Sequence, residues 1–296
     1  MANDQSAHRE LASRGKIGII GYPARHSLSP IFQQAAFDAM KLDLQYEIWE
    51  THLDGLESLI ESMQSTNVYG ANVTMPYKET VIPLLDSIDY SAEIVGAVNT
   101  IVKSNGNLIG YNTDGVGFVE ALTDTGFNMK GQTALILGAG GAARSIAFAL
   151  AYENPSSIII ANRNEKRATA LALSLKEATN ISVIPIPLTE TMMNNWVPKS
   201  DLLVNATSIG MHPQADISPI PDSLIHPDMF VYDLVYNPLE TLLVKRARIR
   251  GAVATGGLSM LIYQGAHAFD LWTGIVAPRE LMRQAAEAHI ARLSNI

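Results

Sequence analysis

The stretch TALILGAGGAARSIAFAL, residues 133–150, decides the fold of this chain. It starts as an apolar run typical of a buried strand and continues, through a glycine-rich turn, directly into a segment with helical periodicity. The spacing G-x-G-x-x-A allows a tight turn at Gly138, close approach of a pyrophosphate at Gly140 and close helix-to-strand packing at Ala143. An ordinary strand-to-helix turn is the alternative. The strand-turn-helix context favours a dinucleotide site.

The end of the next strand, residues 157–162, indicates which dinucleotide binds. An NAD-binding protein places a carboxylate there, about 20 residues after the glycines, to bind the ribose 2′-hydroxyl. This chain has Asn162 at that point, followed by Arg163 and Arg167. Arginines form charge-assisted hydrogen bonds with phosphate, so the sequence favours NADP. Solvated charges at a helix start are the alternative, and Glu165 adds a negative charge nearby.

Apolar runs alternate with helix-period segments along most of the chain, which predicts an α/β fold with mainly parallel sheets. We expect strands at 16–22, 44–50, 69–74 and 97–102 in a first sheet, with a tight hairpin at Asn105-Gly106. A second, Rossmann-type series has strands at 133–139, 157–162, 182–186, 201–207 and 229–235. The helical segments 258–274 and 278–293 have no strand of their own, so we expect them to return to the first domain. The predicted domains are 1–113 completed by 256–296, and 114–255.

Composition excludes several classes of protein. The 296 residues are 47% hydrophobic and 17% charged, which is typical of a folded globular protein. The net charge is -8 and no basic run is present, which argues against nucleic acid as a partner. No cysteine is present, which excludes disulfides and thiolate metal sites, and we assign no metal. We find neither a secretory signal nor an apolar segment long enough to span a membrane, so a cytoplasmic location is expected.

Lys78 lies in NVTMPYKETV, residues 72–81, among small, apolar and hydroxyl side chains. Pro76 can open a helix, in which case Lys78 is a solvated surface charge. The alternative is a positioned ammonium that takes part in catalysis. Ser27 and Ser29 face the same side if this segment is extended, and could bind one polyhydroxylated ligand. Ser29 can also be explained as a helix N-cap before Pro30.

Three further polar residues interrupt apolar or glycine-rich surroundings. Asn99 must find partners if it is buried, either in neighbouring backbone or in a ligand. Asp114 stands at the junction of the two series and can cap a helix or bind a ligand. Gln264 lies on an apolar helix stripe, as a satisfied core amide or as a ligand contact.

Nine segments together resemble the shikimate dehydrogenases. They are GYPARHSLSP, GANVTMPYKE, GAVNTIV, GYNTDGVGF, GAGGAARS, NRNEKR, NATSIGM, DLVYNP and MLIYQGAHAFDLWTG, in the order and spacing of that family. The resemblance covers residues 16–282 and the combination is highly specific.

This resemblance implies NADPH-dependent, reversible reduction of 3-dehydroshikimate to shikimate, with both ligands held in a cleft between the domains. Lys78 and Asp114 would be the catalytic pair, with Lys78 as general acid/base or as electrostatic stabiliser. The implied substrate-binding residues, besides Asp114, are Ser27, Ser29, Thr74, Asn99, Tyr236 and Gln264. The implied NADP-binding residues are Gly138, Ala139, Gly140, Gly141, Ala142, Asn162, Arg163, Asn164, Arg167, Thr207 and Gly257.

Two positions depart from the usual family pattern. Asn164 stands where many NADP-using members have Thr, and Ser259 where Gly is usual near the nicotinamide. Relatives that oxidise quinate share the SLSP and GYNTDG segments, so a quinate/shikimate dehydrogenase using both NAD and NADP is one alternative. A non-catalytic NADP-binding sensor is another. The sequence does not determine the oligomeric state, and a homodimer is one possibility.

Overall fold

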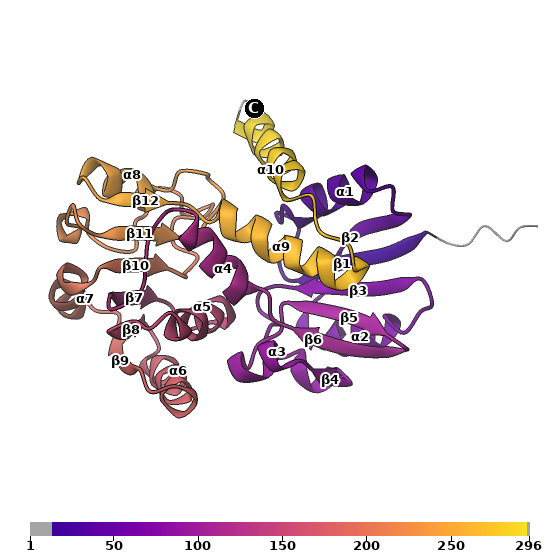
Figure 1. Cartoon of the computed structure of the whole chain (residues 1–296), viewed down its shortest axis with the longest axis horizontal. Helices are drawn as coiled ribbons and strands as arrows, with labels where there is room; N and C mark the ends of the chain where they lie inside the picture. Colours follow the sequence, from indigo (N-terminus) through magenta and orange to yellow (C-terminus); the bar gives the residue numbers. More distant parts are fainter. Residues whose placement is uncertain (1–13, 295–296) are drawn as a thin grey trace, which may run out of the picture.

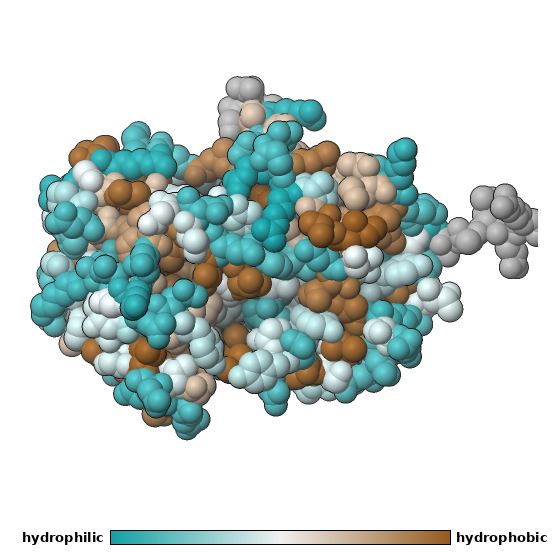
Figure 2. Space-filling model, in the orientation of Figure 1, coloured by the Kyte–Doolittle hydropathy of each residue, from teal (hydrophilic) through white to brown (hydrophobic). Residues whose placement is uncertain are grey.

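A computed structural model describes residues 14–294, in which two β-sheets lie side by side with helices packed around each (Figure 1). The α/β class and the two predicted series are confirmed. Within the described residues, no helix is both long and apolar enough to cross a bilayer. On the face drawn in Figure 2, hydrophilic side chains cover much of the surface and hydrophobic ones form scattered groups.

The first sheet has the strand order β2-β1-β3-β5-β6-β4. Its strands are β1 (Gly15–Gly21), β2 (Leu44–Glu50), β3 (Val68–Val73), β4 (Ser87–Ile88), β5 (Thr100–Ser104) and β6 (Asn107–Tyr111). β1 pairs in parallel with β2 and β3, whereas β5 is antiparallel to both β3 and β6. The predicted hairpin at Asn105-Gly106 is confirmed: both residues have positive φ, 51° and 84°.

The second sheet is parallel throughout, with the order β12-β11-β10-β7-β8-β9. Its strands are β7 (Thr133–Leu137), β8 (Ser157–Asn162), β9 (Ser182–Pro187), β10 (Leu202–Asn205), β11 (Phe230–Asp233) and β12 (Val253–Thr255). The helices of this region are α5 (Gly141–Tyr152), α6 (Glu165–Ala178), α7 (Glu190–Trp196) and α8 (Leu242–Ile249). A buried apolar cluster lies on each face of the sheet, which explains why its strands are apolar without alternation.

The two C-terminal helices return to the first sheet, as predicted (Figure 1). α9 (Leu258–Thr273) and α10 (Arg279–Ser294) share a core with β1 and α1 (Ser29–Ala39). The indole N–H of Trp272 donates to the carbonyl of Ile101 at 2.9 Å, which attaches α9 to β5. Two short helices, α2 (Leu56–Ser62) and α3 (Tyr90–Val95), complete this part of the chain.

The chain passes from the first sheet to the second through α4 (Asp114–Thr123) and returns through α9. These helices cross in close contact: a Cβ on Gly117 would lie 2.5 Å from the backbone nitrogen of Gln264. The predicted domain boundaries fall directly before α4 and directly after β12. The crossing therefore brings the start of α4 and the middle of α9 to the same place between the sheets.

Candidate active site

A cavity of about 160 Å³ lies between the two sheets. Most of its lining residues lie between positions 19 and 114 or between 257 and 264. The other part of the chain contributes Ala142 of α5 and, after β11, Leu234 and Tyr236. Every predicted catalytic and substrate-binding residue lines this cavity: Ser27, Ser29, Thr74, Lys78, Asn99, Asp114, Tyr236 and Gln264. Residues far apart in the sequence are thus brought to one site, at the edge where parallel strands end.

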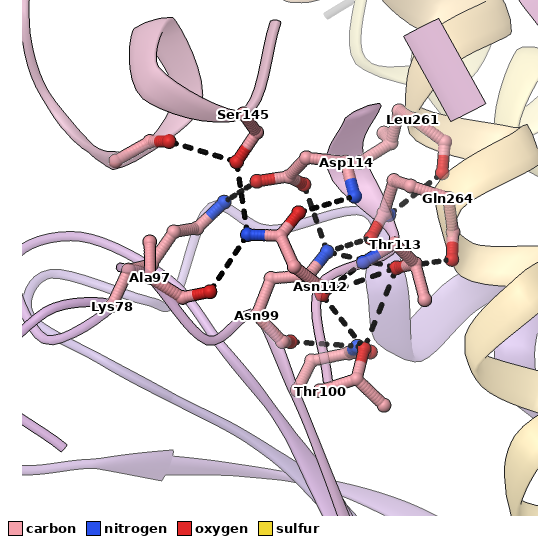
Figure 3. Close-up of polar contacts among 12 residues, drawn as sticks. Lys78, Ala97, Asn99, Thr100, Asn112, Thr113, Asp114, Ser145, Leu261 and Gln264 are labelled. Carbon is pink, nitrogen blue, oxygen red and sulfur yellow. Dashed lines mark hydrogen bonds and ion pairs between the residues drawn. The ribbon is translucent and has the colours of Figure 1, made fainter. Parts of the chain in front are cut away.

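Lys78 points into this cavity, and its ammonium nitrogen lies 2.5 Å from Oδ2 of Asp114 (Figure 3). The two side chains are only 15% and 5% exposed. Residues 74–81 form turns, and the short 3-10 helix that follows begins only at Ile82, so the interpretation of Lys78 as a solvated charge at a helix start is wrong. The cation and the carboxylate compensate each other in a partly desolvated site, where their interaction is stronger than at a surface.

Asp114 is the first residue of α4, and the N-cap position is Thr113. The Thr113 side chain makes no capping hydrogen bond, and the Asp114 carboxylate does not accept from the first N–H groups of the helix, so the interpretation of Asp114 as a cap is wrong. Its carboxylate instead receives Lys78 on Oδ2 and the Asn99 amide on Oδ1, at 2.8 Å. The positive end of the helix dipole also favours a carboxylate here. Both carboxylate oxygens therefore have a defined orientation.

The sequence left open whether Asn99 bonds to neighbouring groups or contacts a ligand, and its position in the structure allows both. Its Oδ1 accepts from the Thr113 backbone N–H at 2.8 Å, and its Nδ2 donates to the Gln264 Oε1 at 3.2 Å as well as to Asp114. Gln264 in turn donates from Nε2 to the Leu261 carbonyl. Neighbouring groups satisfy both buried amides, and both amides still line the cavity.

Ser27 and Ser29 reach the cavity in a different way from the one expected. The segment is not extended, because Leu28 has helical φ and ψ of -81° and -10° and α1 begins at Ser29. Ser29 is not the N-cap: Leu28 occupies that position, and Ser29 is a buried residue of the first turn of α1. The Ser27 Oγ accepts from the Ser29 backbone N–H at 3.2 Å, so Ser27 stabilises the helix start.

Asn72 is a cavity residue that sequence reasoning missed. Its Oδ1 accepts from the Tyr46 hydroxyl at 2.7 Å, and its Nδ2 donates to the Asn99 carbonyl and the Thr100 hydroxyl. The available signal was an amide in the middle of the apolar segment YGANVT. A buried amide held in one orientation can present a fixed hydrogen-bonding surface to a ligand.

Two more of the predicted substrate-binding residues line the cavity. Thr74 directly follows β3 and packs against Gly21, where a Cβ would lie 2.3 Å from the threonine methyl. Tyr236 follows β11 in the second sheet and packs against the core shared by β1, α1 and α9. Burial raises the pKa of Tyr236, which keeps its hydroxyl protonated and able to donate.

The glycine-rich loop connects β7 to α5 with the geometry that the sequence predicts. Gly138 has φ of +114°, and a Cβ there would lie 2.9 Å from the Ala206 carbonyl. A Cβ on Gly140 would meet nothing within 4 Å, so its backbone faces open space. Ala143 is fully buried. Gly140 is the N-cap of α5 and provides no side-chain cap, which leaves the first N–H groups of the helix for a phosphate.

The end of β8 holds the residues expected at the 2′-phosphate. Asn164 is the N-cap of α6, and its Oδ1 accepts from the Arg167 backbone N–H at 3.4 Å. Asn and Thr both serve as N-caps, which explains how Asn164 can replace the usual Thr. Asn162 donates to the Asn164 carbonyl at 2.9 Å. Arg163 is exposed. The Arg167 guanidinium lies 3.2 Å from the carboxylate of Glu79, which belongs to the first part of the chain, between β3 and β4.

The remaining predicted cofactor residues follow β10 and β12. The Thr207 backbone N–H and hydroxyl both donate to the Asn205 Oδ1, which fixes the loop after β10. Gly257 lies so close to Leu234 that a Cβ would be 2.1 Å from its carbonyl oxygen. The Ser259 Oγ accepts from Arg283 of α10 at 3.1 Å, and Ser259 does not line the cavity. The serine at this position is therefore accommodated by α10.

Similarity to known proteins covers nearly the whole chain. Residues 19–101 match the family described as shikimate dehydrogenase substrate binding domain, residues 120–213 match shikimate / quinate 5-dehydrogenase, and residues 257–287 match shikimate 5'-dehydrogenase C-terminal domain. The shikimate dehydrogenase (NADP(+)) of Desulforamulus reducens is 43% identical over 277 residues, which are 93% of this chain and 95% of that protein.

Two solved structures are similar over the same span. A crystal structure of a shikimate dehydrogenase in complex with NADP+ has a TM-score of 0.87 and 40% identity, covering 94% of this chain and 96% of that one. The shikimate 5-dehydrogenase of Thermus thermophilus in complex with NADP(H) and shikimate has a TM-score of 0.83 and 36% identity, covering 93% of this chain and 99% of that one.

Proposed function

Because this chain belongs to the shikimate dehydrogenase family, we propose that it catalyses the reversible, NADPH-dependent reduction of 3-dehydroshikimate to shikimate. The observation that carries the proposal is the Lys78–Asp114 pair, which lines a cavity beside the glycine-rich loop. In this proposal, residues 1–113 and 256–296 form the substrate-binding and catalytic domain, and residues 114–255 form the NADP-binding domain.

Bound NADPH would supply the hydride to the carbonyl carbon. Negative charge then grows on the carbonyl oxygen, and the Lys78 ammonium donates a proton to it or stabilises it electrostatically. Asp114 holds the ammonium in place and can accept a hydrogen bond from a substrate hydroxyl. The Asn99 amide keeps the other carboxylate oxygen of Asp114 occupied, which prevents the carboxylate from rotating away.

The polar residues around the cavity suit a ring that carries several hydroxyls and a carboxylate. The cavity is lined by the hydroxyl residues Ser27, Ser29 and Thr74 and by the amide residues Asn99 and Gln264. Tyr236 approaches from the second sheet. Asn72, which the sequence did not suggest, is added to this set. A site built from such groups rejects an analogue that lacks a matching hydroxyl, because its own polar groups are left unpaired.

The nucleotide side fits NADP. The pyrophosphate would bind at Gly140 and the N-terminus of α5, where the backbone faces open space. Arg163 and Arg167 stand at the end of β8 without a carboxylate at position 162, so a 2′-phosphate would meet cations. Gly138, Ala139, Gly141, Ala142, Asn162, Asn164, Thr207 and Gly257 complete the proposed cofactor site.

An absorbance assay at the NADPH band tests this function. Purified protein is given shikimate or quinate, each with NADP or NAD, and initial rates are compared. We expect the highest kcat/KM with shikimate and NADP. Comparable rates with quinate and NAD would support the quinate/shikimate dehydrogenase instead, which the matching family description also includes. Tight NADPH binding without any turnover would support a non-catalytic sensor.

Two finer parts of the proposal are a cytoplasmic location and a homodimeric assembly. The location agrees with the lack of a membrane-spanning helix in residues 14–294. Cell fractionation tests the location, and size-exclusion chromatography with light scattering tests the assembly.

A further inference from the structure

The glycine-rich loop and the catalytic pair meet at Gly141. A Cβ on Gly141 would lie 3.0 Å from Cβ and 3.1 Å from Cδ of Lys78, so the alkyl chain of the lysine packs directly on this glycine. Gly141 opens α5, the helix whose N-terminus would receive the pyrophosphate. The loop that binds the cofactor thus contacts the lysine that acts on the substrate.

A chain of hydrogen bonds connects the same glycine to Asp114 (Figure 3). The Ser145 hydroxyl donates to the Gly141 carbonyl at 2.9 Å and accepts from the Asn112 Nδ2 at 2.9 Å. The Asn112 Oδ1 accepts from the Asp114 backbone N–H at 3.1 Å. Asn112 also donates to the Ala97 carbonyl at 2.8 Å, so its amide has one orientation.

These two residues are deeply buried, with Ser145 at 0% and Asn112 at 7% exposure. Each has a local explanation, since a helical serine often bonds to the carbonyl four residues back and an asparagine often bonds to the N–H two residues on. Neither of these local hydrogen bonds requires the bond between the Asn112 amide and the Ser145 hydroxyl. That bond joins a side chain of α5 to a side chain of the segment before α4, across the boundary between the two parts of the chain.

Resting on the proposed function, we propose that Ser145 and Asn112, together with Gly141, are positioning residues that couple cofactor binding to the arrangement of the Lys78–Asp114 pair. A pyrophosphate bound at the N-terminus of α5 fixes Gly141. The Ser145–Asn112 connection and the contact with Lys78 transmit that position to both members of the pair. By reciprocity of linkage, shikimate bound at the pair then tightens NADPH binding.

Ser145→Ala tests the connection by removing one atom from it. The Asn112 amide keeps its bond to the Ala97 carbonyl, which still orients it, and loses the acceptor of its second N–H. Ser174→Ala is the matched control, because the Ser174 hydroxyl of α6 bonds to the Ala170 carbonyl four residues back and is not part of the connection. Both variants lose the same kind of helical hydrogen bond.

The measurement is the NADPH dissociation constant, with and without saturating shikimate, by calorimetry. Shikimate and NADPH are both reduced, so no hydride transfer disturbs the equilibrium. We expect a wild-type ratio of the two constants of about 10, in the usual range for coupled sites. Ser145→Ala should reduce the ratio at least about threefold, whereas Ser174→Ala should keep the wild-type ratio.

A wild-type ratio of one, or equal ratios in the two variants, would overturn the coupling. A lower melting temperature with an unchanged ratio would also overturn it, because that is the signature of a merely structural role. If Ser145→Ala does not fold, Gly141→Ala is measured in the same way, since its methyl displaces the Lys78 chain. Turnover of shikimate by the wild type, recorded on the same preparation, separates failure of the coupling from failure of the proposed function.

Discussion

At the scale of single residues, Lys78 has the largest predicted effect. Its ammonium has one carboxylate partner and its alkyl chain packs against Gly141. Lys78→Ala removes the group that meets the developing charge on the substrate oxygen. We expect a loss of roughly 10² to 10⁴-fold in kcat, about 3 to 5 kcal/mol of transition-state stabilisation, with a smaller change in KM.

Lys16→Ala is the control for this variant in steady-state assays. Lys16 also pairs with a carboxylate, Glu47 at 3.0 Å, but it lies on β1 and does not line the cavity. Its kcat should stay near the wild-type value. A Lys78→Ala enzyme with nearly normal turnover would remove the lysine from the mechanism.

Asp233 provides a pH-dependent prediction. Its carboxylate is fully buried and accepts hydrogen bonds from Asn205, Val235 and Thr241, and burial raises its pKa to about 6. In the unfolded chain the pKa is about 3.9. Between these values the folded state binds more protons, so its contribution to stability is fully present below about pH 4. It is lost as the pH rises through about 6.

Urea unfolding of the wild type and of Asp233→Asn at several pH values measures this contribution. The stability of the wild type relative to the variant should fall by up to about 3 kcal/mol between about pH 4 and pH 7, since two pKa units are worth about that much. The difference should be constant at higher pH. A relative stability that rises over this interval would show that hydrogen bonding to the charged form outweighs burial.

Site residues could be identified from the sequence where the segment around them made them stand out. Lys78 and Asp114 were noticeable because they interrupt apolar or glycine-rich segments. The extended path expected at Ser27 and Ser29 and the N-cap interpretation of Ser29 were wrong because both depend on the conformation of Leu28, which is helical. Asn72 was missed because its partners belong to other strands.

At the scale of helices and strands, length decided which elements could be predicted. Buried strands of four to seven residues, β10 and β11 of four residues included, were found because apolar runs are a local signal. β4 has two residues and β12 has three, and both form at sheet edges through pairing with β6 and β11. Such short strands have no periodicity, so only the tertiary structure determines them.

The crossing of α4 and α9 depends on Gly117. A Cβ at this position would lie 2.5 Å from the nitrogen and 2.9 Å from the Cα of Gln264, and backbone atoms cannot move aside as a flexible side chain can. Gly117→Ala should therefore separate the two helices and displace Gln264 from the cavity. We expect a loss of about 1 to 3 kcal/mol in the free energy of unfolding, together with a higher KM for shikimate.

Gly140→Ala is the control for stability, measured by denaturant unfolding without cofactor. Its φ is -94° and its Cβ would meet nothing within 4 Å, so the free energy of unfolding should hardly change. Equal stability of the Gly117 and Gly140 variants would mean that the helices can separate without cost.

At the scale of the whole molecule, the two parts of the chain contact each other beside the cavity. Lys78 packs on Gly141, the Arg144 Nε donates to the Val95 carbonyl at 2.8 Å, and Arg167 pairs with Glu79 at 3.2 Å. The sequence indicated each part separately but not these contacts, because they join residues from different parts of the chain, 49 and 88 positions apart in the last two cases. They depend on how the sheets are placed relative to each other.

The Glu79–Arg167 pair has a consequence for cofactor choice. Arg167 is a proposed ligand of the 2′-phosphate, so the Glu79 carboxylate competes with the phosphate for the same guanidinium. The carboxylate also repels the phosphate, because both are negatively charged. Exposed ion pairs are weak, and these side chains are about half exposed, so the effect is moderate. Glu79→Gln should lower the KM for NADP about two- to fivefold, and leave the KM for NAD unchanged.

Glu240→Gln is the matched control, since Glu240 forms a similarly exposed pair with Arg248 at 2.7 Å, and neither residue is among the proposed cofactor-binding residues. Steady-state kinetics with both cofactors, at low and at high salt, measure the effect, which should shrink as salt screens the charges. If the KM for NADP rises instead, Glu79 holds Arg167 in the orientation that the phosphate needs. Parallel changes for NAD and NADP would mean that the pair influences the contact between the two parts of the chain and not the recognition of the phosphate.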